Sequence, residues 1–418
     1  MEKEKDKSMD KMSRLEKQWI LYDVGNSAFV MLCTTIIPIY FKNLASQAGI
    51  SLADSTAYLS YALSACTVLV AVMGPVFGTL ADTRNYKKPL FAAFFILGVI
   101  GCLSLMIPKQ WLAFLIVLVI AKASYNMSLI FYDSMLIDVT TDERMDVVSS
   151  HGYAWGYIGS CIPFVASLLL ILGADAIGIS GVTATMIAFA ITGAWWFFVT
   201  LPLLKNYQQT HWIEVSDTPV RDSFVRLGNV LTHIGKNKKV LFFLIAFFFY
   251  IDGVYTIIDL ATSYGKDVGI SDTHLLLALL LTQVVAFPCS ILFARFSKRF
   301  KSENLIMISI LGYLGIALFA LQLDKAWEFW FLAVCVAVFQ GAIQALSRSY
   351  FAKIIPKEKS SEYFGFYDIF GKGAAFMGTM LMGISTQLSG SSKTGVFMLA
   401  LMFVVGLIAF RKTTKIEG

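Results

Sequence analysis

Twelve long apolar segments, separated by short polar connections, follow one another along almost the whole sequence. An α-helix rises about 1.5 Å per residue, so about 20 apolar residues cross the ~30 Å hydrocarbon layer of a bilayer. The segments are continuously apolar rather than alternating, which argues against membrane-spanning strands. The pattern predicts an all-α membrane protein with twelve transmembrane helices. The predicted helices cover residues 19–41, 57–81, 89–107, 111–139, 147–172, 182–203, 240–261, 274–294, 305–322, 327–347, 363–387 and 394–410.

The longest polar stretch of the chain divides these segments into two sets of six. We therefore expect an N-terminal six-helix half at residues 1–203, a cytoplasmic linker at residues 204–239 and a C-terminal six-helix half at residues 240–418. Apolar residues repeat at helical spacing within the linker, which predicts an amphipathic helix on the membrane surface; a regulatory or partner-binding role is the alternative. These residues are Val220, Phe224, Leu227, Leu231 and Ile234.

The two halves resemble each other in sequence. The first segment contains Tyr22-Asp23, and the seventh contains Tyr250-Ile-Asp252. Internal similarity between two six-helix sets is typical of secondary transporters that are built from repeats. In such proteins the solute site lies near the middle of the membrane, between the repeats. The sequence thus predicts two pseudo-symmetric halves with a shared central site.

The distribution of positive charge predicts the orientation in the membrane. Of the 34 Lys and Arg residues, 26 lie in the two tails and in every second connection, and 5 lie in the other connections. Because positive residues gather on the cytoplasmic side, we expect both termini of this multi-pass protein in the cytoplasm. Short loops without an evident organelle-sorting extension favour the plasma membrane, and a vacuolar membrane, which would give the same span pattern, is the alternative. A mean hydropathy of +0.69 and 15% charged residues, against about 25% in soluble domains, agree with a lipid bilayer as the surroundings.

The distribution of charge and the absence of a cleavage site exclude several other classes of protein. The net charge of +6 faces anionic lipid headgroups from the cytoplasmic loops, so it does not call for a nucleic acid. The basic start of the chain precedes a segment long enough to span the bilayer, and no small-residue cleavage site follows it. We therefore expect an uncleaved first helix rather than a signal peptide.

Motifs for metals, nucleotides and hydrolysis are missing as well. The six cysteines stand singly in apolar segments, and the four histidines show no ligand spacing, so we expect no metal, no disulfide framework and no cofactor. The stretch 365–372 resembles a phosphate-binding loop only superficially, because five residues separate its glycines and Gly373 stands where Ser or Thr should be. We expect neither a nucleotide partner nor an enzyme.

Charged residues inside the apolar segments are the main candidates for function. A charge that faces lipid is costly, whereas a charge that faces a wet cavity is tolerated. The first, fourth, seventh and eleventh segments carry such residues, so we expect these four helices to line a central pathway. The candidates for solute binding or ion coupling are Asp23, Asn26, Lys122, Asn126, Asp133, Asp252, Asp259, Asp368 and Lys372.

Helical spacing brings several of these candidates together. Lys122 lies eleven residues into its segment, about 16 Å along the helix axis and close to the middle of the bilayer. Asn126 and Asp133 follow at i+4 and i+11, which keeps all three on one face. Asp252 and Asp259 are seven residues apart and also share a face.

Each charged candidate also has a structural interpretation. Asp368 and Lys372 have the i, i+4 order that favours an ion pair within one helix, so a structural pair and a solute or coupling site are equal alternatives. Lys122 either meets a solute or neutralises an acid of a neighbouring helix. Asp252 either marks a kink or acts at mid-membrane. Asp23, a turn inside the boundary, either positions the helix start or moves a proton.

The loop after the second segment reads Gly78-Thr-Leu-Ala-Asp82-Thr-Arg-Asn-Tyr-Lys87-Lys88. It resembles the signature loop of the major facilitator superfamily, G-x-L-A-D-R-x-G-R-K-K, with three departures. The resemblance implies that this loop takes part in gating. Gly78 allows close packing, Asp82 can meet a helix N-terminus, and the two lysines face anionic headgroups. We group Arg348, at the edge of the tenth segment, with these gating candidates.

Six further stretches carry a narrower resemblance: Trp19–Phe29, Phe131–Asp133, Ser149–Gly152, Tyr250–Thr256, Gln344–Ser349 and Phe364–Lys372. Together they resemble the branch of this superfamily that includes the autophagy-related vacuolar amino-acid effluxers and their bacterial relatives. Asp133 stands where that branch usually shows Asn. The resemblance implies a twelve-helix fold with alternating access and the export of small solutes, amino acids being the activity associated with the vacuolar members.

The leading hypothesis is a secondary transporter, facilitative or proton-linked, that exports a small polar or zwitterionic solute, because the expected cavity holds charges of both signs. The expected partners are the solute, the bilayer and protons. A flippase for lipids or amphiphiles, or a drug exporter, is the alternative, supported by 34 Phe, 17 Tyr and 8 Trp. A non-transporting receptor or scaffold is disfavoured, since it has no reason to bear the cost of charges at mid-membrane.

Overall fold

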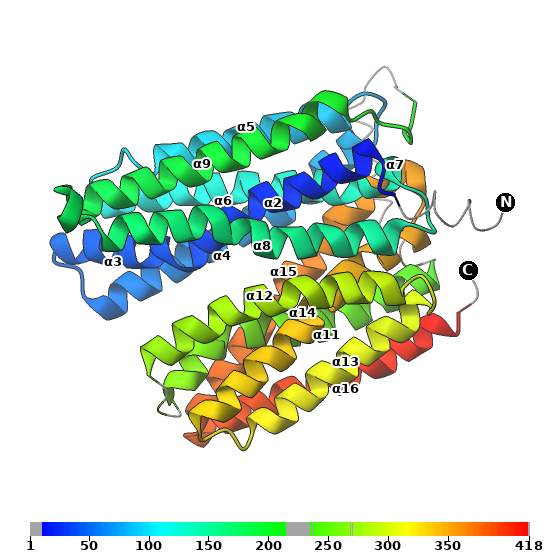
Figure 1. Ribbon diagram of the computed structural model, residues 1–418. Coiled ribbons are helices and arrows are strands. Elements are labelled where there is room, and N and C mark those ends of the chain that lie inside the picture. The colour runs from blue at the N-terminus through cyan, green and yellow to red at the C-terminus, as the bar shows by residue number, and fades with distance from the viewer. Residues whose placement is uncertain (1–10, 215–234, 236, 268, 270, 417–418) are drawn as a thin grey trace.

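The computed structural model describes residues 11–214, 235, 237–267, 269 and 271–416, and helices account for most of them (Figure 1). The N-terminal set comprises α2 (Arg14–Thr34), α3 (Ile36–Gln47), α4 (Leu52–Ala81), α5 (Lys87–Ser104), α6 (Trp111–Ser134), α7 (Leu136–Val139), α8 (Met145–Leu172) and α9 (Gly181–Asn206). The C-terminal set comprises α11 (Lys238–Asp267), α12 (Asp272–Phe296), α13 (Ser302–Ala320), α14 (Ala326–Ile354), α15 (Ser360–Ser389) and α16 (Ser392–Thr414).

Eleven helical stretches of the described residues are long and apolar enough to cross a membrane. The pair α2 and α3 forms the first of them, and the pair α6 and α7 lies within the fourth. The twelfth long helix is α15, which has 30 residues but carries Asp368 and Lys372 in its middle and is therefore more polar. The prediction of an all-α fold with twelve spanning helices in two six-helix halves is confirmed.

The first predicted segment is one span made of two helices that meet at Thr35. The hydroxyls of Thr34 and Thr35 both donate to the carbonyl of Met31, and such bonds to the preceding turn bend helices. Pro38 in the first turn of α3 has no backbone N–H to donate. Together these residues explain why a continuous apolar segment does not form one straight helix.

The amphipathic helix expected at Val220 to Ile234 lies outside the described residues. The chain just before it is described and runs against the N-terminal half. Ile213 donates its backbone N–H to the carbonyl of Asp82 at 2.8 Å, and its own carbonyl accepts from Arg84 at 3.0 Å. The guanidinium of Arg84 also lies over the ring of Trp212, 5.0 Å from its centre. This stretch therefore closes over the loop between α4 and α5.

Two kinds of helix contact organise the bundle. Within the halves, α2 packs on α8 and α9, and α11 packs on α15 and α16. Between the halves, α8 packs on α12 and α14, and α15 packs on α4 and α6. The start of α2 and the end of α16 lie at the same end of the bundle, which we call the termini end (Figure 1). The two halves lie closest there and diverge toward the opposite end (Figure 1).

Candidate functional site

Arg348 of α14 lies at the centre of a polar cluster between the halves, near the termini end. It is 2% exposed. Its Nη1 donates to Asp133 of α6 at 3.0 Å and its Nη2 to Asp23 of α2 at 3.3 Å. Its Nε donates to the hydroxyl of Ser149 of α8 at 2.9 Å. We call these four residues the Arg348 hub; one side chain of the C-terminal half thus binds three helices of the N-terminal half.

Aromatic rings surround the guanidinium of the Arg348 hub. Its central carbon lies 4.6 Å from the ring centre of Trp19 and 4.5 Å from that of Tyr153. A ring face attracts a cation more strongly when water is excluded. The candidate Asn26 lies one turn along α2 and donates to Asp23 Oδ1 at 3.3 Å. The hub is therefore crowded and held from several sides.

A second connection joins the signature loop to the start of α15. The Asp82 carboxylate accepts the backbone N–H groups of Ser361 at 2.8 Å and Glu362 at 2.9 Å. A Cβ on Gly78 would overlap the carbonyl of Ser361, so only glycine lets α4 approach α15 this closely. We call these four residues the Asp82 clasp. A carboxylate at the first free N–H groups of a helix is favoured by hydrogen bonding and by the helix dipole.

Burial and nearby charge act on Asp82 in opposite directions. Burial raises the pKa of Asp82 to about 6, while the neighbouring Lys87 ammonium and the two N–H donors work against that rise. Lys87 itself is buried and donates to Asp138 at 3.1 Å and to Ser360 of α15 at 2.9 Å. Lys88 differs: its ammonium donates to the carbonyl of Lys205 at 3.3 Å on the exposed side. Of the two loop lysines, only Lys87 reaches the opposite half in this way.

Asp138 ties the linker to the same region. Its carboxylate accepts from the hydroxyl of Tyr207 at 2.5 Å and from the backbone N–H groups of Thr210 and His211 at 3.1 and 3.0 Å. The hydroxyl of Tyr207, which lies outside the spans, is buried against this carboxylate, and both effects raise its pKa. The start of the linker is thus held against the Asp82 clasp by one acid.

A third connection was missed in the sequence. Asp146, in the first turn of α8, accepts from the hydroxyls of Ser302 and Ser349 and from the ammonium of Lys353, each at 2.6 Å. We call these four residues the Asp146 clasp. In the sequence, Asp146 stands just before a predicted span and gives no sign of its partners, which lie at least 156 residues away. Lys357 and Asp142 add an exposed pair at 2.9 Å nearby.

Both halves also carry charged groups near the middle of a long helix. Lys122 of α6 forms no hydrogen bond or ion pair within the described part of the chain, although it is only partly buried. Its ammonium interacts electrostatically with the thiols of Cys33 and Cys66. Asn126, one turn on, donates to the Cys66 sulfur at 3.5 Å. Of the interpretations considered for Lys122, an ion pair with a neighbouring acid is therefore not present in this conformation.

The Asp368–Lys372 pair of α15 approaches the same thiol from the other half. The two side chains form an ion pair at 2.5 Å and are 16% and 25% exposed. Both also interact electrostatically with Cys66, the neighbour of Lys122. Two ammonium groups and one carboxylate, from the two halves, thus act electrostatically on the same thiol. The arrangement can receive an anionic group at Lys122 and a cationic group at Asp368.

Asp252 of α11 occupies a different place from the other candidates. It is fully buried inside the C-terminal half, where its Oδ1 accepts the backbone N–H of Gly378 at 2.9 Å and the hydroxyl of Thr256 at 3.4 Å. Asp252 therefore does not share the surroundings of Lys122. The side chain of Asp259, two turns further on, lies outside the described part of the structure.

No metal centre appears among these residues. Within the described part of the chain, no three His, Cys, Asp or Glu side chains are grouped to hold a metal ion. The six cysteines are free thiols. The polar groups that are brought together form hydrogen bonds and ion pairs between helices, which is the chemistry of helix contacts and of ligand binding.

Comparison with known proteins gives the same fold and a family. The family model "Vacuole effluxer Atg22 like" matches residues 13–138 and 137–415. The chain is 42% identical over 405 residues to an uncharacterized MFS-type transporter, YxiO, of Bacillus subtilis, and the alignment covers 96% of this chain and 95% of that protein. It is 23% identical over 471 residues to autophagy-related protein 22 of Eremothecium gossypii, covering 96% and 90%.

A solved structure agrees with the fold. The major facilitator superfamily transporter FucP, in its outward conformation, superimposes with a TM-score of 0.72 at 14% sequence identity, over 96% of this chain and 98% of that one. At this identity the likeness concerns the arrangement of the helices alone.

Proposed function

This chain belongs to the Atg22-like vacuole effluxer family within the major facilitator superfamily, and on this premise we propose that it exports a small polar or zwitterionic solute, with amino acids as the first candidates. The observation that carries the proposal is Lys122, an unpaired ammonium near mid-membrane, beside the Asp368–Lys372 pair of the other half. Charges of both signs match a molecule with a carboxylate and an ammonium. Charged side chains are costly within a membrane, and a solute that pairs with them offsets this cost.

Alternating access is the mechanism we propose. The Arg348 hub and the two clasps join the halves at the termini end, while Lys122 and Lys372 remain partly exposed toward the middle. In this conformation the termini end is closed, and a solute at Lys122 exchanges with the opposite side. Rocking of residues 1–203 against residues 240–418 breaks the hub and clasps and opens the termini end. The linker, residues 204–239, connects the two moving halves.

The distribution of Lys and Arg supports an orientation with the termini end in the cytoplasm, and the bacterial relative supports the plasma membrane as the location. Closure at the termini end then corresponds to an outward-facing conformation. Export begins when the termini end opens and Lys122 meets a solute from the cytoplasm. We propose that a proton enters in exchange and that Asp252 carries it, because a buried carboxyl can be neutralised by a proton and re-ionised when its surroundings change.

Counterflow in proteoliposomes tests the solute site. Unlabelled amino acids inside exchange for labelled ones outside at equal pH, so no proton gradient is needed. Lys122→Gln should lower the exchange tenfold to a hundredfold, since a hydrogen bond to a charged group contributes about 1.5–3 kcal/mol. Lys109→Gln, the same change on an exposed lysine between α5 and α6, should leave it unaltered.

The outcomes separate the parts of the proposal. Exchange that is equal in the wild type and in Lys122→Gln contradicts the assigned solute site. No exchange of any amino acid by the wild type contradicts amino acids as the solute, and the same vesicles then serve to test fluorescent lipids, the expected cargo of a flippase. Lys122→Arg should retain most of the exchange because it keeps the positive charge.

A further inference from the structure

The carboxylate of Asp252 is held unequally at its two oxygens. Oδ1 accepts two hydrogen bonds, whereas Oδ2 is buried and has no hydrogen-bond partner within the described residues. An ionised carboxylate with one bare oxygen is expensive in an apolar interior. A proton on Oδ2 removes that cost and leaves Oδ1 free to accept from the two donors.

Gly378 makes this arrangement possible. A Cβ at this position would overlap both Asp252 Oδ1 and Thr256 Oγ1, so any other residue would push α15 away from α11. The backbone N–H is a donor that cannot rotate away, and it fixes which oxygen is left bare. The site is therefore built by the packing of two helices, α11 and α15, rather than by a chance neighbour.

A cavity of about 110 Å³ lies beside α11, and its wall begins one helical turn from Asp252. Thr256, which donates to Asp252, forms part of its wall, and so does Met382, one turn beyond Gly378. The wall continues to Leu323 and Leu399, near the connections of the end opposite the termini. The space exceeds the 10–15 Å³ that about one water molecule requires.

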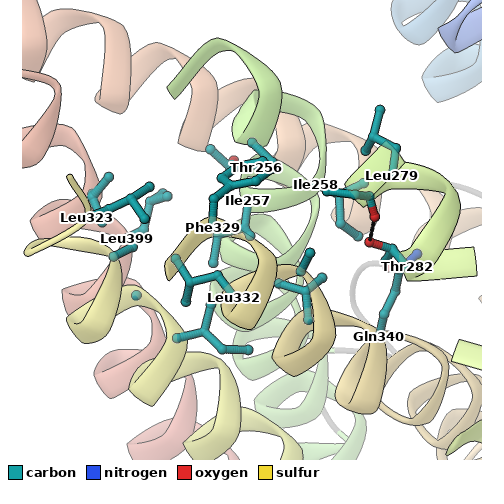
Figure 2. Close-up of a pocket in the computed structure, with 18 of the residues that line it drawn as sticks. Thr256, Ile257, Ile258, Leu279, Thr282, Leu323, Phe329, Leu332, Gln340 and Leu399 are labelled. Carbon is teal, nitrogen blue, oxygen red and sulfur yellow. Dashed lines mark hydrogen bonds between the residues drawn. The ribbon is translucent and has the colours of Figure 1, made fainter. Parts of the chain in front are cut away.

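Polar side chains interrupt the mostly apolar wall of this cavity. Thr256, Thr282 and Gln340 line it among leucine, isoleucine and alanine side chains (Figure 2). Gln283 is a fourth polar residue of the wall. Water in a cavity needs about two to four polar partners, so these four residues determine where a water molecule can bind. Thr256 is the one that joins the cavity to Asp252.

The other side of Asp252 is closed by aromatic side chains. Tyr250 donates to or accepts from Ser347 at 2.6 Å, and Phe247 stacks on Tyr367 with ring centres 4.1 Å apart. Gly253 lies against the ring of Phe403. Toward the termini end, Asp252 is thus followed by packed rings rather than by a cavity wall.

Other titratable groups lie on the helices packed around Asp252. They include Tyr250 and Tyr255 on α11, His274, Cys289 and Arg295 on α12, Tyr313 on α13, Cys335, Arg348 and Tyr350 on α14, Tyr363, Tyr367, Asp368 and Lys372 on α15, and Arg411 on α16. Within the described residues, none of them donates a hydrogen bond to Oδ2. The proton state of Asp252 therefore depends mainly on burial, Gly378 and Thr256.

We propose that Asp252 exchanges its proton with the opposite end of the bundle through this cavity, inside the C-terminal half and apart from the solute path at Lys122. The proposal rests on the proposed transport function and gives its coupling step a route. A hydronium ion at Thr256 transfers its proton to the Asp252 carboxylate and leaves as water, and the reverse step returns the proton. Thr256 positions the water that makes the transfer.

Infrared difference spectroscopy tests the route without any transport. The carbonyl band of a protonated carboxyl that disappears in Asp252→Asn belongs to Asp252, and it shifts when deuterium replaces the proton. In D2O, Thr256→Val should slow this shift at least tenfold, because valine keeps the volume and removes the hydroxyl. Thr256→Ser should restore the rate. Thr192→Val, on a buried threonine of α9 in the other half, is the matched control.

A second variant fills the cavity instead of changing Thr256. Ala278→Phe, on a buried wall residue of α12, should also slow the exchange. If Thr256→Val and Ala278→Phe both exchange at the wild-type rate, or if no Asp252 band exists, the route is wrong. A wild type without solute flux contradicts the proposed function instead. Gradient-driven flux that is lost in Thr256→Val, while counterflow persists, supports both.

Discussion

The Asp82 clasp and the Asp146 clasp perform comparable tasks with different chemistry. Both fasten the halves at the termini end through one carboxylate. Asp82 belongs to a loop and accepts backbone N–H groups, whereas Asp146 belongs to a helix and accepts hydroxyls and an ammonium. The connection after α12, residues 297–301, has no acid that could copy Asp82. The two halves are thus similar in fold but not in how they are fastened.

The two clasps also differ in whether their hydrogen-bond donors can reach water once the carboxylate is removed. Ser361 and Glu362 at the start of α15 are at most 1% exposed, so their N–H groups would lose their partner without gaining water. Lys353 is 23% exposed and can turn toward water. An unsatisfied buried donor costs more than an exposed one. We therefore expect the Asp82 clasp to contribute more to closure than the Asp146 clasp.

The largest effect is expected at the Arg348 hub, which lies between the clasps. Arg348→Met leaves the carboxylates of Asp23 and Asp133 without their counter-charge and should weaken closure by about 3–5 kcal/mol. Ser134→Cys provides the measurement, because Ser134 is buried against Ser361 of the other half. Labelling of this cysteine by an impermeant maleimide from the termini end, followed by peptide mass spectrometry, reports opening.

Labelling at this position should rise more than a hundredfold in Arg348→Met. Arg299→Met, on an exposed arginine after α12, is the matched control and should not change it. A rate that stays at the wild-type value would mean that the hub does not hold the halves together.

Asp82→Asn should have the next largest effect. The amide keeps the size of the side chain but replaces one acceptor oxygen by an NH2 group that faces a backbone N–H donor, so about 1.5–3 kcal/mol of closure is lost. The same cysteine should label tenfold to a hundredfold faster. Asp175→Asn, on an exposed acid between α8 and α9, serves as the control. An effect no larger than that of this control would exclude the Asp82 clasp.

A smaller effect is expected when Asp146 is changed. Asp146→Asn should weaken closure by about 1 kcal/mol, because Lys353 can turn toward water and the amide oxygen still accepts from a serine hydroxyl. Added salt should reduce the difference between this variant and the wild type, whereas it should leave the effect of Asp82→Asn unaltered. If Asp146→Asn opens the protein more than Asp82→Asn does, the comparison of the clasps is reversed.

The smallest expected effect is that of pH on the Asp82 clasp. Burial raises the pKa of Asp82 to about 6 in the closed conformation, whereas a solvated aspartate titrates near about 3.9. The closed conformation therefore binds the proton more tightly. Its extra stability is fully present below about pH 3.9 and is lost as the pH rises through about 6.

Lowering the pH on the termini side from about 7.5 to about 5.5 should favour closure roughly fourfold by this linkage. The labelling rate of the cysteine at position 134 measures this change in closure. The rate is divided by that of an exposed cysteine, which corrects for the pH dependence of the reagent. Asp82→Asn should abolish the dependence. A closure that weakens on acidification would contradict a raised pKa of Asp82 in the closed conformation.

The helices could be predicted from the sequence because membrane spans are long and apolar. The bend at Thr35 escaped, since it arises from hydroxyl bonds and Pro38 inside an apolar segment. The Asp368–Lys372 ion pair could be predicted as one of two interpretations, because its members are only four residues apart in the sequence. The partners of Arg348 are 215 and 325 residues away, so only the packing of the halves reveals them.

The candidate site shows the same limit of local patterns. Lys122 and Asp252 stand out as charges in apolar segments, yet their surroundings differ: one faces the other half, and one is enclosed within its own. Gly378 carries no chemical group that would mark it, because its contribution is a backbone N–H and the absence of a side chain. Such contributions depend on how two helices meet.

Solute flux driven by a pH gradient is the most direct test of the central claim. Labelled amino acids are loaded into proteoliposomes that contain the purified wild type or Asp252→Asn. Flux is then compared with and without a pH gradient. We predict gradient-dependent flux in the wild type, and in Asp252→Asn only exchange that no longer responds to the gradient. Gradient-driven flux that survives in Asp252→Asn would contradict the account.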